Sequence, residues 1–249
     1  MSALLEVQHL AKSYGALRVT QDVSFDVLPG ELHAIIGPNG AGKTTLIHQL
    51  SGMASSSEGR VVFDGQDVTG LGMPERVQAG LARSFQITSI LPQFSTLANV
   101  AMAVQARSGS SFRFLQDAAR QDELNAPARA LLERFGLGPR ADVPAGLLSH
   151  GEKRQLELAI ALATEPKLVL LDEPLAGTSH EESRRIVDIL LALKGRTAIL
   201  LIEHDMEAVF ALADRVSVLV YGRLIATGSP AEIRQNPEVR AAYLGEEAA

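Results

Sequence analysis

One eight-residue segment constrains this chain more than any other feature. Residues 37–44 read Gly-Pro-Asn-Gly-Ala-Gly-Lys-Thr and match the pattern G-x-x-x-x-G-K-[ST]. An apolar run at 34–36 precedes the segment, and a helical pattern over 43–50 follows it. A strand, a Gly-rich loop and a helix in this order are typical of a phosphate-binding loop. An accidental Gly-rich turn is the alternative, and these flanking elements argue against it.

The chemistry expected of this loop follows from its residue types. Glycines let backbone amides turn inward around phosphate oxygens, and the start of the following helix attracts anions. We expect Lys43 to reach the β- and γ-phosphates of a nucleotide and the Thr44 hydroxyl to hold Mg²⁺. The predicted phosphate-binding set comprises Gly37, Asn39, Gly40, Ala41, Gly42, Lys43, Thr44 and Thr45.

A second segment supplies carboxylates. Residues 168–174 read Leu-Val-Leu-Leu-Asp-Glu-Pro, so a buried strand would deliver Asp172 and Glu173 at its C-terminal end. Asp172 is placed to bind Mg²⁺ directly or through water, and Glu173 can orient and polarise an attacking water. A strand followed by an ordinary polar turn is the alternative, and the phosphate-binding loop earlier in the chain makes that interpretation less favourable.

The rest of the chain alternates between strand-rich and helix-rich parts. Polar and apolar residues alternate over 5–9 and 23–27, and the turn Pro29-Gly30 followed by a strand at 31–37 suggests a hairpin. The segment from 87 to about 166 is mostly helical. Short apolar runs at 168–171 and 199–202 are typical of buried parallel strands, and a hairpin follows over 216–227. We therefore expect one α/β core interrupted by a helical insertion.

Composition excludes several classes of protein. The 249 residues carry 23 basic and 29 acidic side chains, a net charge of −6, which supplies no field for general nucleic-acid binding. There is no Cys for disulfides, and no apolar run approaches the roughly 18 residues of a membrane span. The N-terminus lacks the pattern of a signal peptide. The sequence thus predicts a cytoplasmic protein without a nucleic-acid partner, whose membrane role would come through another chain.

A third motif lies between the two phosphate-site segments. Residues 148–152 read Leu-Ser-His-Gly-Glu, and Ser149 with Glu152 forms the S-x-x-E capping box of a helix start. Such a helix end attracts anions, although capping boxes alone are common. With the three motifs in this order, the sequence strongly resembles the nucleotide-binding subunit of an ABC transporter, whose signature motif is usually written LSGGQ. The resemblance covers nearly the whole chain.

The resemblance implies a fold and a division of the chain. The fold is a P-loop NTPase core of the ABC-ATPase type, an α/β class, with an N-terminal antiparallel β-subdomain and an inserted helical subdomain. Residues 1–249 would form a single ATP-binding domain. Within it, 1–86 and 166–249 would form the core with the β-subdomain, and 87–165 the helical subdomain with the signature motif.

The resemblance also implies roles for further residues. Ser149, Gly151 and Glu152 would bind ATP held by a second subunit in a head-to-tail dimer. Gln86 would sense Mg²⁺ and the attacking water, and His204 would contact the γ-phosphate. Tyr14 would stack on adenine. The implied catalytic residues are then Glu173, His204 and Gln86, and the implied metal ligands are Thr44, Gln86 and Asp172.

Segments 83–86, 201–206 and 236–246 resemble the ATPase subunits of branched-chain amino-acid importers, which have relatives for urea and amides. This implies an ATP-hydrolysing subunit that powers import, peripheral on the cytoplasmic face of the inner membrane. Its partners would be an identical or paralogous ATPase subunit, permease subunits and, indirectly, a periplasmic solute-binding protein. A lipopolysaccharide-export ATPase and a non-transport ABC ATPase remain alternatives. A GTP switch is suggested by Asp67-Val68-Thr69-Gly70, but no N-K-x-D motif accompanies it.

Two positions depart from the family pattern. His150 stands where the general motif has Gly, and Ser179 stands where the family has Asp or Asn. Ser179 with Glu182 forms another capping box, so its structural role is kept while a possible contact with the opposite subunit is lost. We expect ATP binding to be intact and coupling between the two sites to be weakened.

Overall fold

The computed structural model describes residues 2–84, 90–107 and 122–244. The chain divides into two compact units. The first comprises Met1–Leu81, Lys167–Glu173 and Leu193–Ala249, and the second comprises Ala82–Pro166 and Pro174–Ala192. Within the described ranges, no helix combines the length and the apolar character needed to cross a membrane.

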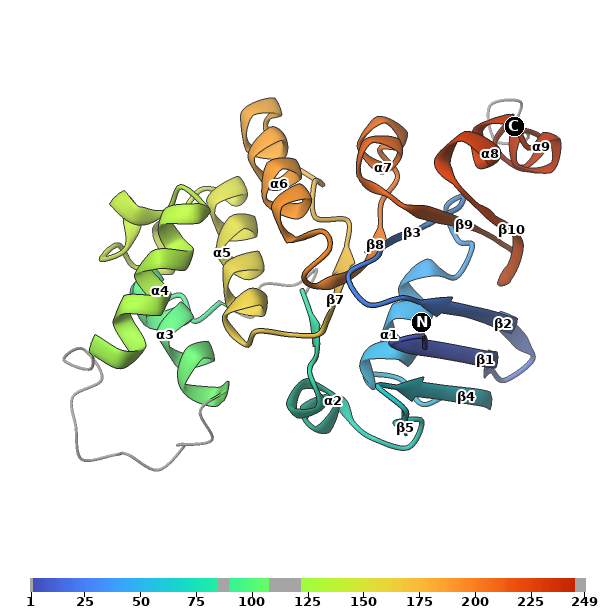
Figure 1. Cartoon of the computed structure of the whole chain (residues 1–249), viewed down its shortest axis with the longest axis horizontal. Helices are drawn as coiled ribbons and strands as arrows, with labels where there is room; N and C mark the ends of the chain where they lie inside the picture. Colours follow the sequence, from blue (N-terminus) through green and yellow to red (C-terminus); the bar gives the residue numbers. More distant parts are fainter. Residues whose placement is uncertain (1, 85–89, 108–121, 245–249) are drawn as a thin grey trace. The chain divides into compact units, whose positions relative to one another are not determined.

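The first unit contains a four-stranded antiparallel sheet in the order β2-β1-β4-β5 (Figure 1). Its strands are β1 (Leu5–Tyr14), β2 (Leu17–Val27), β4 (Glu58–Phe63) and β5 (Gln66–Asp67). Alternate residues such as Leu5, Val7, Val23 and Val27 are buried, because only one face of the sheet meets the core. The predicted antiparallel β-subdomain is confirmed.

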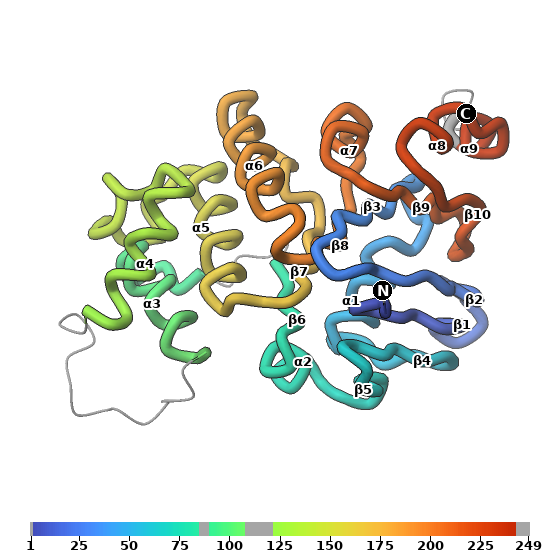
Figure 2. Tube along the Cα trace, viewed as in Figure 1, coloured from blue at the N-terminus to red at the C-terminus, as the bar shows by residue number. Residues whose placement is uncertain are grey.

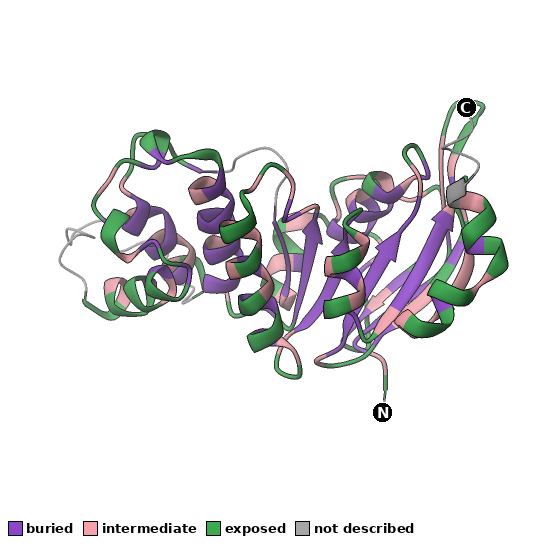
Figure 3. Ribbon diagram, turned by 90° about the horizontal axis from the view of Figure 1, so that it is seen from above, coloured by how far each residue is buried: buried purple, intermediate pink, exposed green. Residues whose placement is uncertain are grey.

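The second sheet has six strands in the order β10-β9-β3-β8-β7-β6. They are β3 (Leu32–Ile36), β6 (Leu81–Arg83), β7 (Leu168–Asp172), β8 (Ala198–Ile202), β9 (Arg215–Val220) and β10 (Arg223–Gly228). β3 is parallel to β8 and β9, and β7 is parallel to β8. Every residue of β3, β7 and β8 is buried, which explains why their sequences are apolar apart from His33 and Asp172 (Figure 3).

The hairpin predicted for residues 23–27 and 31–37 is wrong. β2 pairs with β1, whereas β3 pairs with β8 and β9 in the other sheet. The Pro29-Gly30 turn instead carries the chain between the sheets, and the Leu28 amide donates to Glu31 Oε2 at 2.6 Å across it. The physical reason is burial, because an apolar strand such as β3 needs a neighbour on each edge and cover on both faces.

The helices of the first unit follow their sequence signals. α1 (Lys43–Ser51) ends at Gly52, whose φ of 78° closes the helix in the left-handed conformation. The others are α2 (Met73–Ala79), α7 (Met206–Leu212), α8 (Pro230–Gln235) and α9 (Pro237–Leu244), the last two following the β9–β10 hairpin (Figure 2). Side chains of α1 and of both sheets share one core, which includes Leu46, Ile47, Leu50, Phe63, Ile35 and Leu200.

The second unit is helical, as the sequence indicates. It contains α3 (Thr96–Arg107), α4 (Asp122–Arg134), α5 (His150–Ala163) and α6 (His180–Leu193), with short 3₁₀ turns at Gly138–Arg140 and Ala145–Leu147. α3, α4 and α5 pack against one another. Their buried side chains include Val100, Val104, Leu132, Phe135 and Leu156.

A buried arginine ties α2 to α1. Arg76 is 2% exposed, and its guanidinium donates to the carbonyls of Gln49 and Leu50 at 2.8 and 2.7 Å. It also donates to the carbonyls of Leu71 and Thr69, each at 3.0 Å. Burial lowers the pKa of Arg76. The carbonyl dipoles at the C-terminal end of α1 stabilise the buried cation.

We predict that Arg76→Met lowers the free energy of unfolding of the first unit by about 3 kcal/mol, because two buried and two part-buried hydrogen bonds to carbonyls are lost. Urea unfolding followed by circular dichroism measures the change. The matched control is Arg60→Met, because Arg60 forms an exposed ion pair with Asp67 and its loss should cost less than about 0.5 kcal/mol. Equal unfolding midpoints for the two variants would contradict the assignment.

Candidate functional site

Three of the predicted segments lie at the carboxyl ends of neighbouring parallel strands. The loop 37–42 follows β3, Glu173 follows β7, and residues 203–204 follow β8. Ile202 of β8 stands opposite both Ile35 of β3 and Asp172 of β7. The strand pairing therefore brings the loop, the two carboxylates and His204 to one edge of the sheet, where ligands of open α/β sheets bind.

Two glycines of the loop 37–42 are required by close approach to other strands. A Cβ at Gly42 would lie 2.6 Å from the carbonyl oxygen of Val19, and the φ of 104° at this position also disfavours any side chain. A Cβ at Gly37 would overlap the carbonyl oxygen of Leu219. The loop is thus packed between β2 and β9, a constraint that the local pattern does not reveal.

The start of α1 fits a polyanionic ligand. Gly42 is its N-cap residue, and no side chain caps the helix there, so its first amides face the loop instead of a capping oxygen. Lys43 Nζ donates to the carbonyls of Gly37 and Pro38 at 2.6 and 2.9 Å. The ammonium therefore already lies over the loop where phosphates are expected. Of the other predicted residues, Asn39, Gly40 and Thr44 are exposed, Thr45 is half-buried and Ala41 is buried.

The end of β7 holds its two carboxylates differently. Asp172 is the last residue of the strand and is 1% exposed. Glu173 has a φ of 49°, which is uncommon for a residue with a side chain, and its amide donates to the carbonyl of Ile202 at 2.8 Å. Backbone strain of this kind is concentrated at functional sites, and here it re-aims the chain immediately after the strand.

The end of β8 brings His204 to Glu173. The His204 side chain is 63% exposed, and its Nδ1 lies 3.8 Å from Glu173 Oε1. The same nitrogen lies 3.7 Å from Glu203 Oε2, and the Glu203 side chain is fully buried. Sequence reasoning selected Glu173 and His204 but passed over Glu203. The signal that could have found it is a carboxylate placed directly after a fully apolar strand.

The remaining predicted residues of the first unit are placed less completely. Tyr14 ends β1, is 53% exposed, and has Lys12 Nζ 5.1 Å from its ring centroid, so the ring can stack on a base. Gln86 lies outside the described residues. No cluster of three His, Asp or Glu side chains that could hold a metal occurs in the described part of the chain. Thr44 and Asp172 fit Mg²⁺ nonetheless, because this ion binds through a few protein oxygens together with substrate phosphates and water.

The predicted capping box at the start of α5 is present. The Ser149 amide donates to Glu152 Oε2 at 2.8 Å, and the Glu152 amide donates to Ser149 Oγ at 3.1 Å. Arg140 Nε donates to Glu152 Oε1 at 2.8 Å. Burial raises the pKa of Glu152, but the hydrogen bonds from Ser149 and Arg140 outweigh it, so the pKa lies below its usual value. The helix start is fixed by its own side chains.

Two further contacts in the second unit connect α5 to the segment before α6. The His150 ring lies against Gly177, where a Cβ would be 2.9 Å from its Nε2. A Cβ on Gly151 would overlap the carboxylate of Glu182. The Ser179–Glu182 capping box is also present, with the Ser179 amide donating to Glu182 Oε2 at 2.8 Å. Glu182 therefore both completes the capping box of α6 and lies against Gly151.

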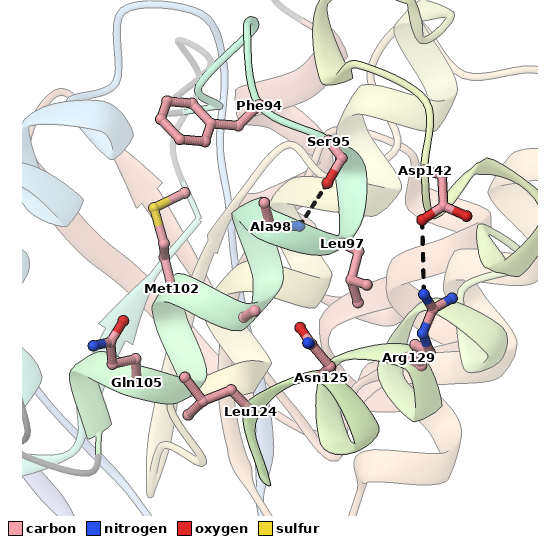
Figure 4. Close-up of a pocket in the computed structure, with 11 residues that line it drawn as sticks. Phe94, Ser95, Leu97, Ala98, Met102, Gln105, Leu124, Asn125, Arg129 and Asp142 are labelled. Atoms are coloured by element: carbon pink, nitrogen blue, oxygen red, sulfur yellow. Dashed lines mark hydrogen bonds and ion pairs between the residues drawn. The ribbon is translucent and has the colours of Figure 1, made fainter. Parts of the chain in front are cut away.

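The second unit also has a cavity of about 290 Å³ between α3 and α4 (Figure 4). Phe94, Met102 and Leu124 give it a mainly apolar lining, and an ion pair between Arg129 and Asp142 of 3.6 Å lies at it. None of the predicted site residues lines it. The predicted phosphate-site residues therefore lie at the sheet edge and not at this cavity.

Comparison with known families identifies the family to which the chain belongs. The family described as "ABC transporter" matches residues 20–176, and the family described as "Branched-chain amino acid ATP-binding cassette transporter" matches residues 223–249. The chain belongs to the ABC transporter ATP-binding family. This ATPase is thus an ATP-binding subunit of an ABC transporter, and its reaction is ATP hydrolysis.

The D-x-x-G segment at residues 67–70, which suggested a GTP switch, is a turn in which Asp67 Oδ1 accepts from the Thr69 amide at 2.9 Å.

Individual relatives of this ABC ATPase extend over nearly its full length. It is 35% identical over 98% of both chains to the high-affinity branched-chain amino acid transport ATP-binding protein LivG of Escherichia coli K12. It is 33% identical over 98% of both chains to the lipopolysaccharide export system ATP-binding protein LptB of Haemophilus influenzae. The crystal structure of the ADP conformation of MJ1267, an ATP-binding cassette of an ABC transporter, superposes with a TM-score of 0.85 at 29% identity, covering 98% and 100% of the two chains. The predicted fold class is confirmed.

We predict that Gly42→Ala lowers ATP affinity about tenfold or more, because the new Cβ must displace the loop from Val19 and adopt a strained φ. Titration with a fluorescent ATP analogue measures the affinity. Gly70→Ala is the matched control, since a Cβ there has no neighbour within 4 Å. If the Gly42→Ala chain binds as tightly as the control, the loop does not hold the phosphates.

Proposed function

We propose that this ABC ATPase powers the import of branched-chain amino acids or a related small solute through a membrane permease. The family match over 223–249 and the likeness to LivG over the whole chain support this substrate class. The observation that carries the catalytic part is the meeting of the loop 37–42, Asp172, Glu173 and His204 at the carboxyl ends of β3, β7 and β8.

Each group at this edge has a distinct role in the proposal. The loop amides and Lys43 hold the β- and γ-phosphates, while Tyr14 stacks on the adenine. Thr44 and Asp172, together with Gln86, hold Mg²⁺, which when bound neutralises phosphate charge. Glu173 orients the attacking water and accepts its proton. Gln86 contacts the same water. His204, held near Glu173, donates to a γ-phosphate oxygen.

The proposed assembly is a head-to-tail pair of ATPase subunits, identical or paralogous. The start of α5, with Ser149, Gly151 and Glu152, faces the γ-phosphate of ATP bound to the other subunit. Permease subunits bind the pair at the cytoplasmic face of the inner membrane, and a periplasmic solute-binding protein acts through them. The family membership of the chain supports this arrangement.

We also propose that residues 1–249 form one ATP-binding domain, with 1–86 and 166–249 as the core and 87–165 as the helical subdomain. The unit boundaries after Leu81 and after Pro166 support this division. The segment Pro174–Ala192, which contains most of α6, clusters with the helical unit.

Glu173→Gln tests the catalytic assignment. We expect ATP affinity within about twofold of the unmodified chain and at least a 100-fold lower rate of hydrolysis, because the amide cannot accept a proton from water. Equilibrium binding and phosphate release measure the two quantities. Glu58→Gln is the matched control, since Glu58 is an exposed carboxylate of β4. Retained hydrolysis would exclude Glu173 as the catalytic carboxylate.

The same variant tests the direction and substrate of transport. In vesicles containing the chain with its permease and partner ATPase, ATP on the outer, cytoplasm-equivalent face should drive labelled leucine out of the lumen, where the solute-binding protein delivers it. Glu173→Gln should abolish this movement. The likeness to LptB makes lipopolysaccharide export the second candidate, and lipopolysaccharide-stimulated hydrolysis without leucine transport would favour it.

Ser179→Asn tests the departure in the segment before α6. We expect the Asn side chain to restore a contact with the opposite subunit and to raise the turnover and cooperativity of ATP hydrolysis in the assembled transporter, with ATP affinity unchanged. Asn keeps the capping role that Ser179 performs with Glu182, so the start of α6 should be preserved. Ser179→Ala is the control that removes the cap. Unchanged turnover and cooperativity in Ser179→Asn would contradict the hypothesis.

A further inference from the structure

Glu203 is a buried carboxylate at the carboxyl end of β8. It directly follows β8, in which all five residues are buried, and its own side chain is 0% exposed. A carboxylate removed from water is costly unless hydrogen bonds compensate it. An apolar residue would pack better at this strand end. Packing therefore does not explain why a carboxylate stands at position 203.

Three contacts of Glu203 involve the two residues that follow it. Glu203 Oε2 accepts from the backbone amide of His204 at 3.0 Å and from that of Asp205 at 3.4 Å. The same oxygen lies 3.7 Å from His204 Nδ1. One carboxylate oxygen therefore fixes the turn that carries His204 and also faces the ring.

The elements on either side of His204 are rigid. Ile202 pairs with β3 and β7, and its carbonyl accepts from the Glu173 amide at 2.8 Å. On the other side, Asp205 Oδ1 accepts from the amides of Glu207 and Ala208 at 3.0 and 3.1 Å and so caps α7. Glu203 connects these two fixed points and holds the backbone from which the His204 ring extends.

We propose that Glu203 is a positioning residue that orients His204 for contact with the γ-phosphate. The proposal rests on the proposed function, in which His204 donates to that phosphate and Glu173 orients the water. Carboxylate oxygens of Glu203 and Glu173 lie 3.7 and 3.8 Å from Nδ1, so Nε2 is the ring nitrogen that faces the ligand and donates to it.

The kinetic test uses the full-length chain in its assembled transporter. Glu203→Gln keeps the shape and a hydrogen-bond acceptor for the two amides but removes the charge next to Nδ1. We expect kcat for ATP hydrolysis to fall about tenfold with KM for ATP within about twofold. Glu207→Gln is the matched control, because Glu207 is an exposed carboxylate in the first turn of α7, and kcat should not change.

A double variant separates positioning from a structural role. If Glu203 acts through His204, then Glu203→Gln should cause no further loss of kcat in a His204→Ala chain. The same fold-loss in both backgrounds, or a Glu203→Gln chain as active as Glu207→Gln, would overturn the proposal. Glu173→Gln separates failure of this proposal from failure of the proposed function. Retained hydrolysis in that variant contradicts the proposed function, whatever the role of Glu203.

A spectroscopic measurement tests the proposal without relying on turnover. Imidazole ¹⁵N spectra of the full-length chain, assigned by comparison with His204→Ala, report which ring nitrogen carries a proton. We expect the ring ¹⁵N resonances of His204 to differ between the unmodified chain and Glu203→Gln, because the carboxylate next to Nδ1 is lost. Identical His204 resonances in the two chains would overturn the proposal.

Discussion

The parallel pairing of β8 with β3 and β7 is the constraint on which the site depends. Ile202 stands opposite Ile35 on one side and Asp172 on the other, so the three strands end level with one another. The loop 37–42, Glu173 and His204 lie just beyond these ends. A shift of one residue in any of the three strands would turn its side chains to the opposite face and separate the loop from the carboxylates.

Three residues that follow the strands depart from the usual preferences for backbone conformation, burial of charge and helix capping. Glu173 adopts a left-handed backbone, Glu203 is a fully buried carboxylate, and Gly42 begins α1 without a side-chain cap. Each of these choices is unfavourable in an ordinary loop. The buried central strands β3, β7 and β8 tolerate these three departures at their carboxyl ends.

Local patterns predicted much of this, and long-range contacts account for what they missed. The phosphate loop, both capping boxes and the buried parallel strands follow from short spacings. The predicted hairpin rests on the Pro29-Gly30 turn and is wrong because β3, whose residues are all buried, is a central strand between β8 and β9. The contact of Gly42 with Val19 and the bonding of Arg76 to Gln49 depend on residues more than 20 positions apart, which no local pattern shows. Glu203 was missed because a glutamate after a strand is normally exposed.

The central claim is that one sheet edge gathers the loop 37–42, Thr44, Asp172, Glu173 and His204 around the phosphates of the ATP that this chain binds. A crystal structure of the Glu173→Gln chain with ATP and Mg²⁺ tests it most directly. The account predicts the triphosphate along residues 37–44, the metal between Thr44 and Asp172, and His204 within hydrogen-bond distance of the γ-phosphate. A triphosphate bound elsewhere, or a metal distant from Asp172, would contradict it.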